Sequence, residues 1–134
     1  MKYLLDTDIC IYLIRKKPVS VIRKLDTLPN SEIALSTISI FELQYGVENS
    51  QHRKQSQLAL NHFLEPIQHI LPVDRQVAEY AARVRARLKE MGTPIGPYDV
   101  LISAVALSHE LILVSNNTKE FERVEGLKLE NWSK

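Results

Sequence analysis

The stretch Tyr3-Leu4-Leu5-Asp6-Thr7-Asp8 changes abruptly from apolar to acidic, and it decides the fold. Its apolar half predicts a buried strand, and the spacing of Ile9 and Leu13 after it predicts a helix. A buried strand that leads into a helix is typical of an open parallel sheet, in which ligands bind at the carboxyl ends of the strands. The sequence therefore predicts that a first strand delivers carboxylates to the functional edge of such a sheet.

The rest of the chain continues this alternation of strands and helices. Further strands are predicted at residues 32–36, 67–71, 111–114 and 127–130, and helices at 9–17, 18–28, 40–46, 53–64, 74–91, 98–107 and 120–124. The most regular helical pattern is an apolar stripe made by Val77, Ala81, Val84, Leu88 and Met91. We expect one α/β domain over residues 1–134, with a mostly parallel sheet of four to five strands covered by helices on both faces.

Composition excludes several classes of protein. The 134 residues are 45% apolar, and 17 Lys and Arg against 16 Asp and Glu leave a formal charge of +1. This balance is not typical of a general polyanion binder, so any nucleic-acid contact must come from a local patch. A single cysteine, Cys10, excludes an internal disulfide and fits a reducing compartment. No apolar run approaches the ~20 residues of a membrane span, so we expect a cytoplasmic protein.

Four carboxylates follow predicted strands or open predicted helices. Asp6 ends the first strand, Glu42 lies early in the helix after the second, Asp99 opens the helix after Pro97, and Glu120 follows the fourth strand. If these residues share one edge of the sheet, their charges repel one another unless protons or a cation keep them together. Carboxylate oxygens suit Mg²⁺, with Mn²⁺ as a substitute, and such ions assist hydrolysis of phosphodiesters.

A simpler interpretation exists for each of these positions, because acidic and amide side chains also cap helices and complement the helix dipole. This applies to Asp6 and Asp8, to the capping-box pair Ser39 and Glu42, to Asp99, and to Asn117 with Glu120.

Four segments together resemble the VapC-type toxins of the PIN-domain family. They are Leu4-Leu5-Asp6-Thr7-Asp8, the Ser39–Gly46 segment, the Ile95–Ala104 segment with Gly96-Pro97-Tyr98-Asp99, and the Val114–Val124 segment, followed by Leu129-Glu130-Asn131-Trp132. The resemblance covers essentially the whole chain. It implies a three-layer α/β/α fold and a Mg²⁺-dependent endoribonuclease toxin of a type II toxin–antitoxin system. It also implies a VapB-like antitoxin as partner, a homodimer, and transfer RNA, the initiator in particular, as the substrate.

The resemblance also assigns roles within the site. It makes Asp6 and Asp99 the principal metal ligands and Glu42 the third acidic catalytic residue. Further candidate members are Asp8, Thr7 and Ser39, the last two as residues that orient carboxylates, together with Asn117 and Glu120. Many PIN domains have Asp where Asn117 stands, so a second metal ion and the entry of Glu120 into the site stay open.

Two surfaces are expected outside the catalytic cluster. Lys119 and Arg123 flank the predicted active edge and are candidates for RNA contact. The denser basic run Arg83, Arg85, Arg87 and Lys89 is a further candidate for RNA contact, but we favour its interpretation as a solvated helix face. An apolar groove beside the first helices is the expected seat of the antitoxin.

Two alternatives compete with the nuclease. Asp6-Thr7-Asp8 also resembles the nucleophile motif of haloacid-dehalogenase-like phosphatases, but Cys10 stands where that family has Thr, and no late acidic pair is found in the sequence. The other alternative is a catalytically inactive PIN binding module, which the Asn117 substitution keeps open.

Overall fold

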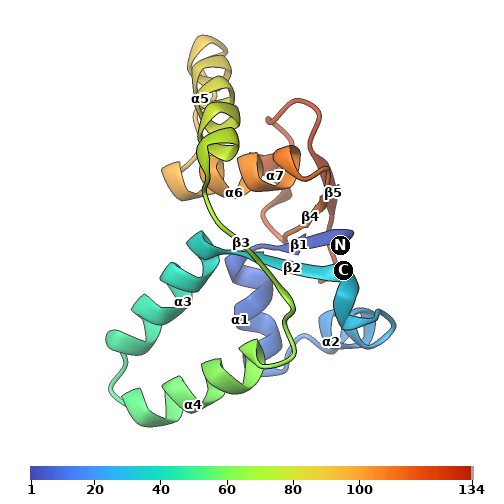
Figure 1. Cartoon of the computed structure of the whole chain (residues 1–134), viewed down its shortest axis with the longest axis vertical. Coiled ribbons are helices and arrows are strands. Elements are labelled where there is room, and N and C mark those ends of the chain that lie inside the picture. The colour runs from blue at the N-terminus through green and yellow to red at the C-terminus, as the bar shows by residue number, and fades with distance from the viewer. Residues whose placement is uncertain (134) are drawn as a thin grey trace.

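Five strands form one parallel sheet in the computed structural model, which describes residues 1–133 (Figure 1). They are β1 (Tyr3–Leu5), β2 (Ile33–Ser36), β3 (His69–Leu71), β4 (Ile112–Val114) and β5 (Lys128–Glu130), arranged in the order β3-β2-β1-β4-β5. The prediction of a mostly parallel sheet of four to five strands is confirmed. Lys134, the last residue of the predicted domain, lies outside the described residues.

Helices cover both faces of the sheet and make the three-layer α/β/α arrangement (Figure 1). On one side lie α1 (Thr7–Arg15), α2 (Val19–Asp26), α3 (Thr37–Glu48) and α4 (Arg53–Leu64); on the other lie α5 (Arg75–Glu90), α6 (Pro97–Ser108) and the short α7 (Thr118–Phe121). A 3₁₀ turn, Asn30–Glu32, leads into β2. Within residues 1–133, no helix combines the length and the hydropathy that crossing a bilayer requires.

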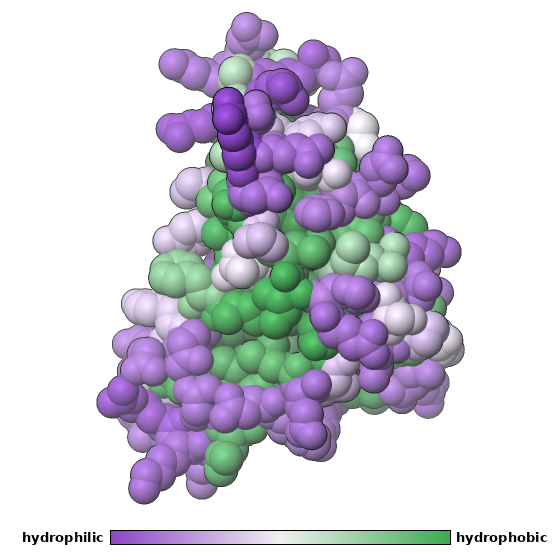
Figure 2. All heavy atoms as spheres, in the orientation of Figure 1, coloured by the Kyte–Doolittle hydropathy of each residue, from purple (hydrophilic) through white to green (hydrophobic). Residues whose placement is uncertain are grey.

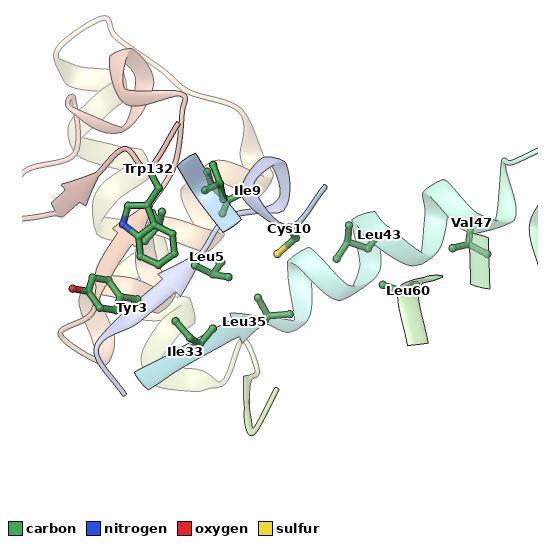
Figure 3. Packing of buried hydrophobic residues seen from close by; sticks show 12 residues of the cluster. Tyr3, Leu5, Ile9, Cys10, Ile33, Leu35, Leu43, Val47, Leu60 and Trp132 are labelled. Carbon is green, nitrogen blue, oxygen red and sulfur yellow. The ribbon is translucent and has the colours of Figure 1, made fainter. Parts of the chain in front are cut away.

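Alternation of side chains along β1 explains why its whole apolar run is buried. Tyr3 and Leu5 belong to the cluster packed against α1 to α4, whereas Leu4 belongs to the cluster packed against α5 and α6. Figure 3 shows the first cluster, with Leu5, Leu35 and Ile9 close together and the Trp132 ring beside Tyr3. Burial on both faces is what a central parallel strand requires, and it accounts for the continuous apolar stretch.

The molecular surface is hydrophilic over α5 and apolar over the middle of the same face, where β3 crosses (Figure 2). β3 is an edge strand, and its Ile70 side chain is exposed. β3 is only three residues long, so its free edge offers few backbone groups for pairing with another chain.

Some predicted boundaries were wrong. The third strand begins at His69 rather than residue 67, and the last short helix spans Thr118–Phe121 rather than 120–124. The second helix begins after Pro18, which is its N-cap. In the stripe on α5, Val77, Ala81 and Leu88 are buried, but Met91 is exposed because the helix ends at Glu90 and Met91 is only its C-cap.

Strand order brings three carboxyl ends side by side. β1 lies between β2 and β4, and Leu5 pairs with Val114. The Asp6 amide donates to the Val114 carbonyl at 3.0 Å, which continues this pairing to the end of the strand. Residues that follow β1, β2 and β4 therefore meet at one edge of the sheet.

Candidate active site

Asp6 is the most deeply buried carboxylate of the site and has two roles there. It is the N-cap of α1, and its Oδ1 accepts a hydrogen bond of 3.0 Å from the Ile9 amide. Burial raises the pKa of Asp6 to about 6, the Ser115 hydroxyl and the Ile9 amide oppose the rise, and the charges of Asp8 and Glu42 add to it. The capping interpretation of Asp6 is thus confirmed, and the cap holds this carboxylate at the edge of the sheet.

Glu42 is held by a hydroxyl from another helix. The Thr7 hydroxyl of α1 donates to Oε1 of Glu42 on α3 at 2.7 Å and lies 3.0 Å from the Ser39 hydroxyl. Since Thr7 gives its hydrogen to Glu42, Ser39 is the donor in the second bond. The capping-box interpretation of Ser39 and Glu42 is wrong, because α3 begins one turn earlier, with Ser36 as N-cap accepting from the Ser39 amide at 3.1 Å.

Asp99 lies in the first turn of α6 and interacts with three other carboxylates. Its pKa is raised to about 7, first by burial, then by a hydrogen bond and charge repulsion with Glu120, and further by the charges of Asp6 and Glu42. Its raised pKa means that Asp99 holds its proton to higher pH than an ordinary aspartic acid does.

Glu120 is placed by Asn117. Asn117 is the N-cap residue of α7, but its side-chain Nδ2 donates to Oε2 of Glu120 at 3.1 Å. The expectation that Asn117 serves as a side-chain cap is therefore wrong. Its amide instead turns Glu120 toward the cluster, which contains four carboxylates: Asp6, Glu42, Asp99 and Glu120.

One further residue, Asp8, differs from its predicted role, and another, Ser115, was not predicted. Asp8 is exposed in the first turn of α1, where Asp6 is the cap, so the expectation that Asp8 caps this helix is wrong. Ser115, which the sequence reasoning missed, is buried directly after β4 and contacts Asp6 through its hydroxyl. The rule that strand ends converge could have found it, because Ser115 follows β4 as Asp6 follows β1.

The two basic candidates lie on and just after α7. Lys119 is exposed next to Glu120, and Arg123 donates from Nη1 to the Pro94 carbonyl at 3.1 Å. Arg123 also lines a hollow with Arg83 and Arg87 from α5, where Arg87 forms an ion pair of 2.9 Å with Glu125.

The donor set fits a divalent cation by its chemistry. Within residues 1–133, no three His, Cys, Asp or Glu side chains already stand in metal-binding geometry. Burial raises the pKa of Asp6 and of Asp99, and the charges of the neighbouring carboxylates add to both rises. Positive charge between the carboxylates would remove that repulsion. Oxygen-only donors are those preferred by hard cations.

A groove runs beside this cluster between α1, α3 and α4. Most of the side chains that line it are apolar or small, and two charged residues, Arg15 and Glu42, line it as well. The apolar residues are Ile11, Ile14, Leu43, Val47, Ala59 and Leu60. The predicted apolar groove next to the first helices is therefore present, and Glu42, a carboxylate of the cluster, is part of its lining.

Comparison with known proteins gives the family. The PIN domain matches residues 3–127 of the chain. The chain belongs to the PIN-domain family. The predicted PIN-like fold is thereby confirmed, and the haloacid-dehalogenase alternative loses its basis because a different family matches nearly the whole chain.

Full-length PIN-domain relatives are VapC proteins. A tRNA(fMet)-specific endonuclease VapC from Shigella flexneri is 41% identical over 133 residues, which are 99% of this chain and 99% of the relative. Ribonuclease VapC2 from Rickettsia felis is 42% identical over 135 residues, 100% of each chain. The crystal structure of VapBC2 from Rickettsia felis, bound to a DNA fragment from their promoter, matches with a TM-score of 0.91 and 39% identity and covers 98% of this chain and 99% of that chain. This PIN domain is thus a homologue of VapC ribonucleases, and PIN-domain ribonucleases generally depend on divalent metals.

Proposed function

We propose that the protein is a Mg²⁺-dependent endoribonuclease, the toxin of a type II toxin–antitoxin pair. The observation that carries the proposal is the gathering of Asp6, Glu42, Asp99 and Glu120, which come from four separate parts of the chain, into one electrostatically coupled cluster. The names of the VapC relatives support the reaction type.

In this proposal the carboxylates of Asp6 and Asp99 would hold the cation, and Glu42 would complete the acidic set. When bound, a divalent ion supplies charge neutralisation for the phosphodiester and activation of water. Thr7, Ser39 and Ser115 fix the orientation of Glu42 and Asp6. Burial and the neighbouring Glu120 raise the pKa of Asp99, so its proton would have to leave before Asp99 binds a cation. Asn117 holds Glu120 in place through its side-chain amide. Lys119 and Arg123 would contact RNA phosphates.

We further propose transfer RNA, the initiator in particular, as the substrate. The relative from Shigella flexneri carries this specificity in its name, and the two chains align over nearly their full length. A homodimer is proposed on family grounds.

The proposed inhibitor is a VapB-like antitoxin seated in the groove between α1, α3 and α4. An amphipathic segment would bury its apolar side against Ile11, Leu43 and Leu60. Because Glu42 is part of the lining of this groove, an antitoxin bound there would reach the acidic cluster. Solved VapBC assemblies among the structural relatives support this partner class.

The test is cleavage of RNA by the purified chain. Wild type should cut an initiator transfer RNA transcript in Mg²⁺ and lose this activity in EDTA. Asp99→Asn and Asp6→Asn should each abolish cutting, and Asp6→Asn retains an oxygen that can cap α1. Asp26→Asn is the matched control, because it removes an exposed carboxylate at the end of α2.

Equal cutting by wild type and Asp99→Asn would contradict the proposal and favour the inactive binding module. Equal cutting of initiator and elongator transfer RNA would contradict only the substrate assignment. Addition of the antitoxin should stop cutting, and sedimentation of the isolated chain as a monomer at micromolar concentration would contradict the homodimer.

A further inference from the structure

Two aromatic rings are exposed at the rim of the acidic cluster. Phe41 on α3 is 52% exposed and Tyr98 on α6 is 44% exposed, and their rings meet edge to face with centroids 5.6 Å apart and planes at 72°. One turn further along α3, Tyr45 is 63% exposed. In the described part of the chain, none of the three belongs to either of the core clusters. Folding therefore does not explain why these rings are there.

Their position in the chain ties them to the carboxylates. Phe41 directly precedes Glu42, and Tyr98 directly precedes Asp99. Both carboxylates interact within one cluster, so the ring pair bridges the same two helices, α3 and α6, from the solvent side. A molecule whose phosphate reached Glu42 and Asp99 would therefore bring its neighbouring groups close to the residues that carry these rings.

We propose that Phe41 and Tyr98 form a stacking platform for an unpaired nucleobase next to the scissile phosphate. This inference rests on the proposed ribonuclease function and adds to it two residues, Phe41 and Tyr98, that would position the substrate. A base joined to the bound phosphate through one sugar can lay its flat face on an aromatic ring only if it is released from a helical stack. Stacking of this kind accepts any base, so it selects for unpaired RNA.

We favour a nucleobase over a second copy of this chain as the group that covers these rings. Phe41 and Tyr98 directly precede Glu42 and Asp99, so a symmetric protein contact on the rings would bring a second set of the same carboxylates close to the first. Burying uncompensated charges is strongly unfavourable. An RNA complex would also contain the divalent cation proposed above, whose charge would offset the charges of the carboxylates.

The test separates stacking from mere apolar contact. Phe41→Leu and Tyr98→Leu keep an apolar side chain but lose the ring, whereas Phe41→Tyr and Tyr98→Phe keep the ring. Leu58→Ala is the control, because Leu58 is 69% exposed on α4 and lies outside the groove lining. Each change is made in wild type, for kinetics, and in the Asp6→Asn background, for binding of a single-stranded oligoribonucleotide that contains 2-aminopurine.

The leucine variants should bind the single strand about 10-fold more weakly, with a higher KM and loss of the 2-aminopurine quenching that stacking causes. Phe41→Tyr, Tyr98→Phe and Leu58→Ala should bind the single strand as tightly as the protein without these changes. All variants should bind a blunt RNA duplex with the same affinity. Unchanged binding by the leucine variants would overturn the inference. The inference would also be overturned if Phe41→Leu dissociated a dimer in sedimentation but left RNA binding unchanged. Failure of wild type to cut RNA would overturn the proposed function instead, and the binding measurements would still decide on stacking.

Discussion

At the scale of single residues, the candidate site depends on hydroxyl and amide groups that hold carboxylates in place. The Thr7 hydroxyl is the clearest case, because it connects α1 to Glu42 on α3 over a distance of 2.7 Å. Sequence adjacency to Asp6 marked Thr7 as a candidate, but its partner could not be predicted, since residues 7 and 42 meet only after the strands pair.

Replacement of Thr7 by Val should reduce catalysis more than it reduces stability. The valine has nearly the same shape but cannot donate to Glu42, so we expect RNA cleavage to fall about 10-fold or more, as for other residues that orient ligands. The free energy of unfolding should change by only about 1 kcal/mol. Single-turnover cleavage and urea denaturation measure the two effects. Thr7→Ser retains the hydroxyl and should resemble wild type; equal loss in both variants would show that the hydroxyl is not responsible.

A second residue-scale consequence concerns pH. The pKa of Asp99 is raised from 3.8 to about 7, so the folded chain binds more protons than the unfolded chain between about pH 4 and pH 7. The free energy of unfolding therefore falls as pH rises through that window, because the folded protein must release the proton of Asp99. The isosteric variant Asp99→Asn carries no charge at any pH, so its free energy of unfolding does not fall for this reason.

In EDTA, Asp99→Asn should match wild type in stability at about pH 4 and exceed it above about pH 7. Because Asp99 is partly exposed, solvent screening limits the gain to about 1 kcal/mol. Thermal unfolding of both proteins across this pH range measures it, and Mg²⁺ should remove the advantage by stabilising wild type. A gain that is largest at low pH would contradict the assigned cause.

At the scale of helices and strands, the sequence predicted most of the fold, because its strands are short apolar runs buried on both faces and its helices have clear ends. α4 was predicted to its terminal residues, and α5 begins and ends one residue inside the predicted range of 74–91. Errors arose where several polar residues could serve the same role. Ser36 and Ser39 both satisfy the N-cap pattern, and only packing selects Ser36.

The same reasoning explains which parts of the site were predictable. Parallel strands bring the residues after β1, β2 and β4 to one edge, so the approach of Asp6 and Glu42 followed from chain order. The orientation of Glu120 did not, because α7 is a single turn and the choice between solvent and Asp99 depends on the Asn117 amide. Ser115 is a further case in which strand order supplied the position but residue type gave no signal.

Two glycines provide a prediction at this scale. Gly46 lies within α3 with helical backbone, Gly92 follows α5 with φ of 69°, and an added Cβ would meet no atom within 4 Å at either position. Alanine should therefore stabilise the protein by up to about 1 kcal/mol at Gly46, through helix propensity. At Gly92 it should destabilise by a similar amount, since φ is left-handed there. Chemical denaturation of the two variants measures the difference, and the same sign at both sites would contradict this account.

At the scale of the whole molecule, charge is nearly balanced in sum but unevenly distributed. The formal charge is +1, yet the catalytic edge carries Asp6, Glu42, Asp99 and Glu120 together. RNA phosphates approaching this edge are repelled unless a cation or a nearby basic side chain compensates. Lys119 is exposed beside Glu120 and is the basic residue nearest to that acidic residue in the chain.

Replacement of Lys119 by Gln should therefore weaken RNA binding by a similar factor for every sequence and should lower the slope of log affinity against log salt by about 1. Fluorescence anisotropy with a labelled transfer RNA, titrated at several salt concentrations in Mg²⁺, measures both quantities in the Asp6→Asn background. Lys54→Gln is the matched control, because it removes an exposed charge from the start of α4, outside the groove lining. If both variants lose affinity equally, RNA responds to the total charge of the protein, and the local contact assigned to Lys119 is wrong. If only Lys119→Gln loses affinity and the slope falls with it, a single phosphate contact beside the acidic cluster accounts for the loss.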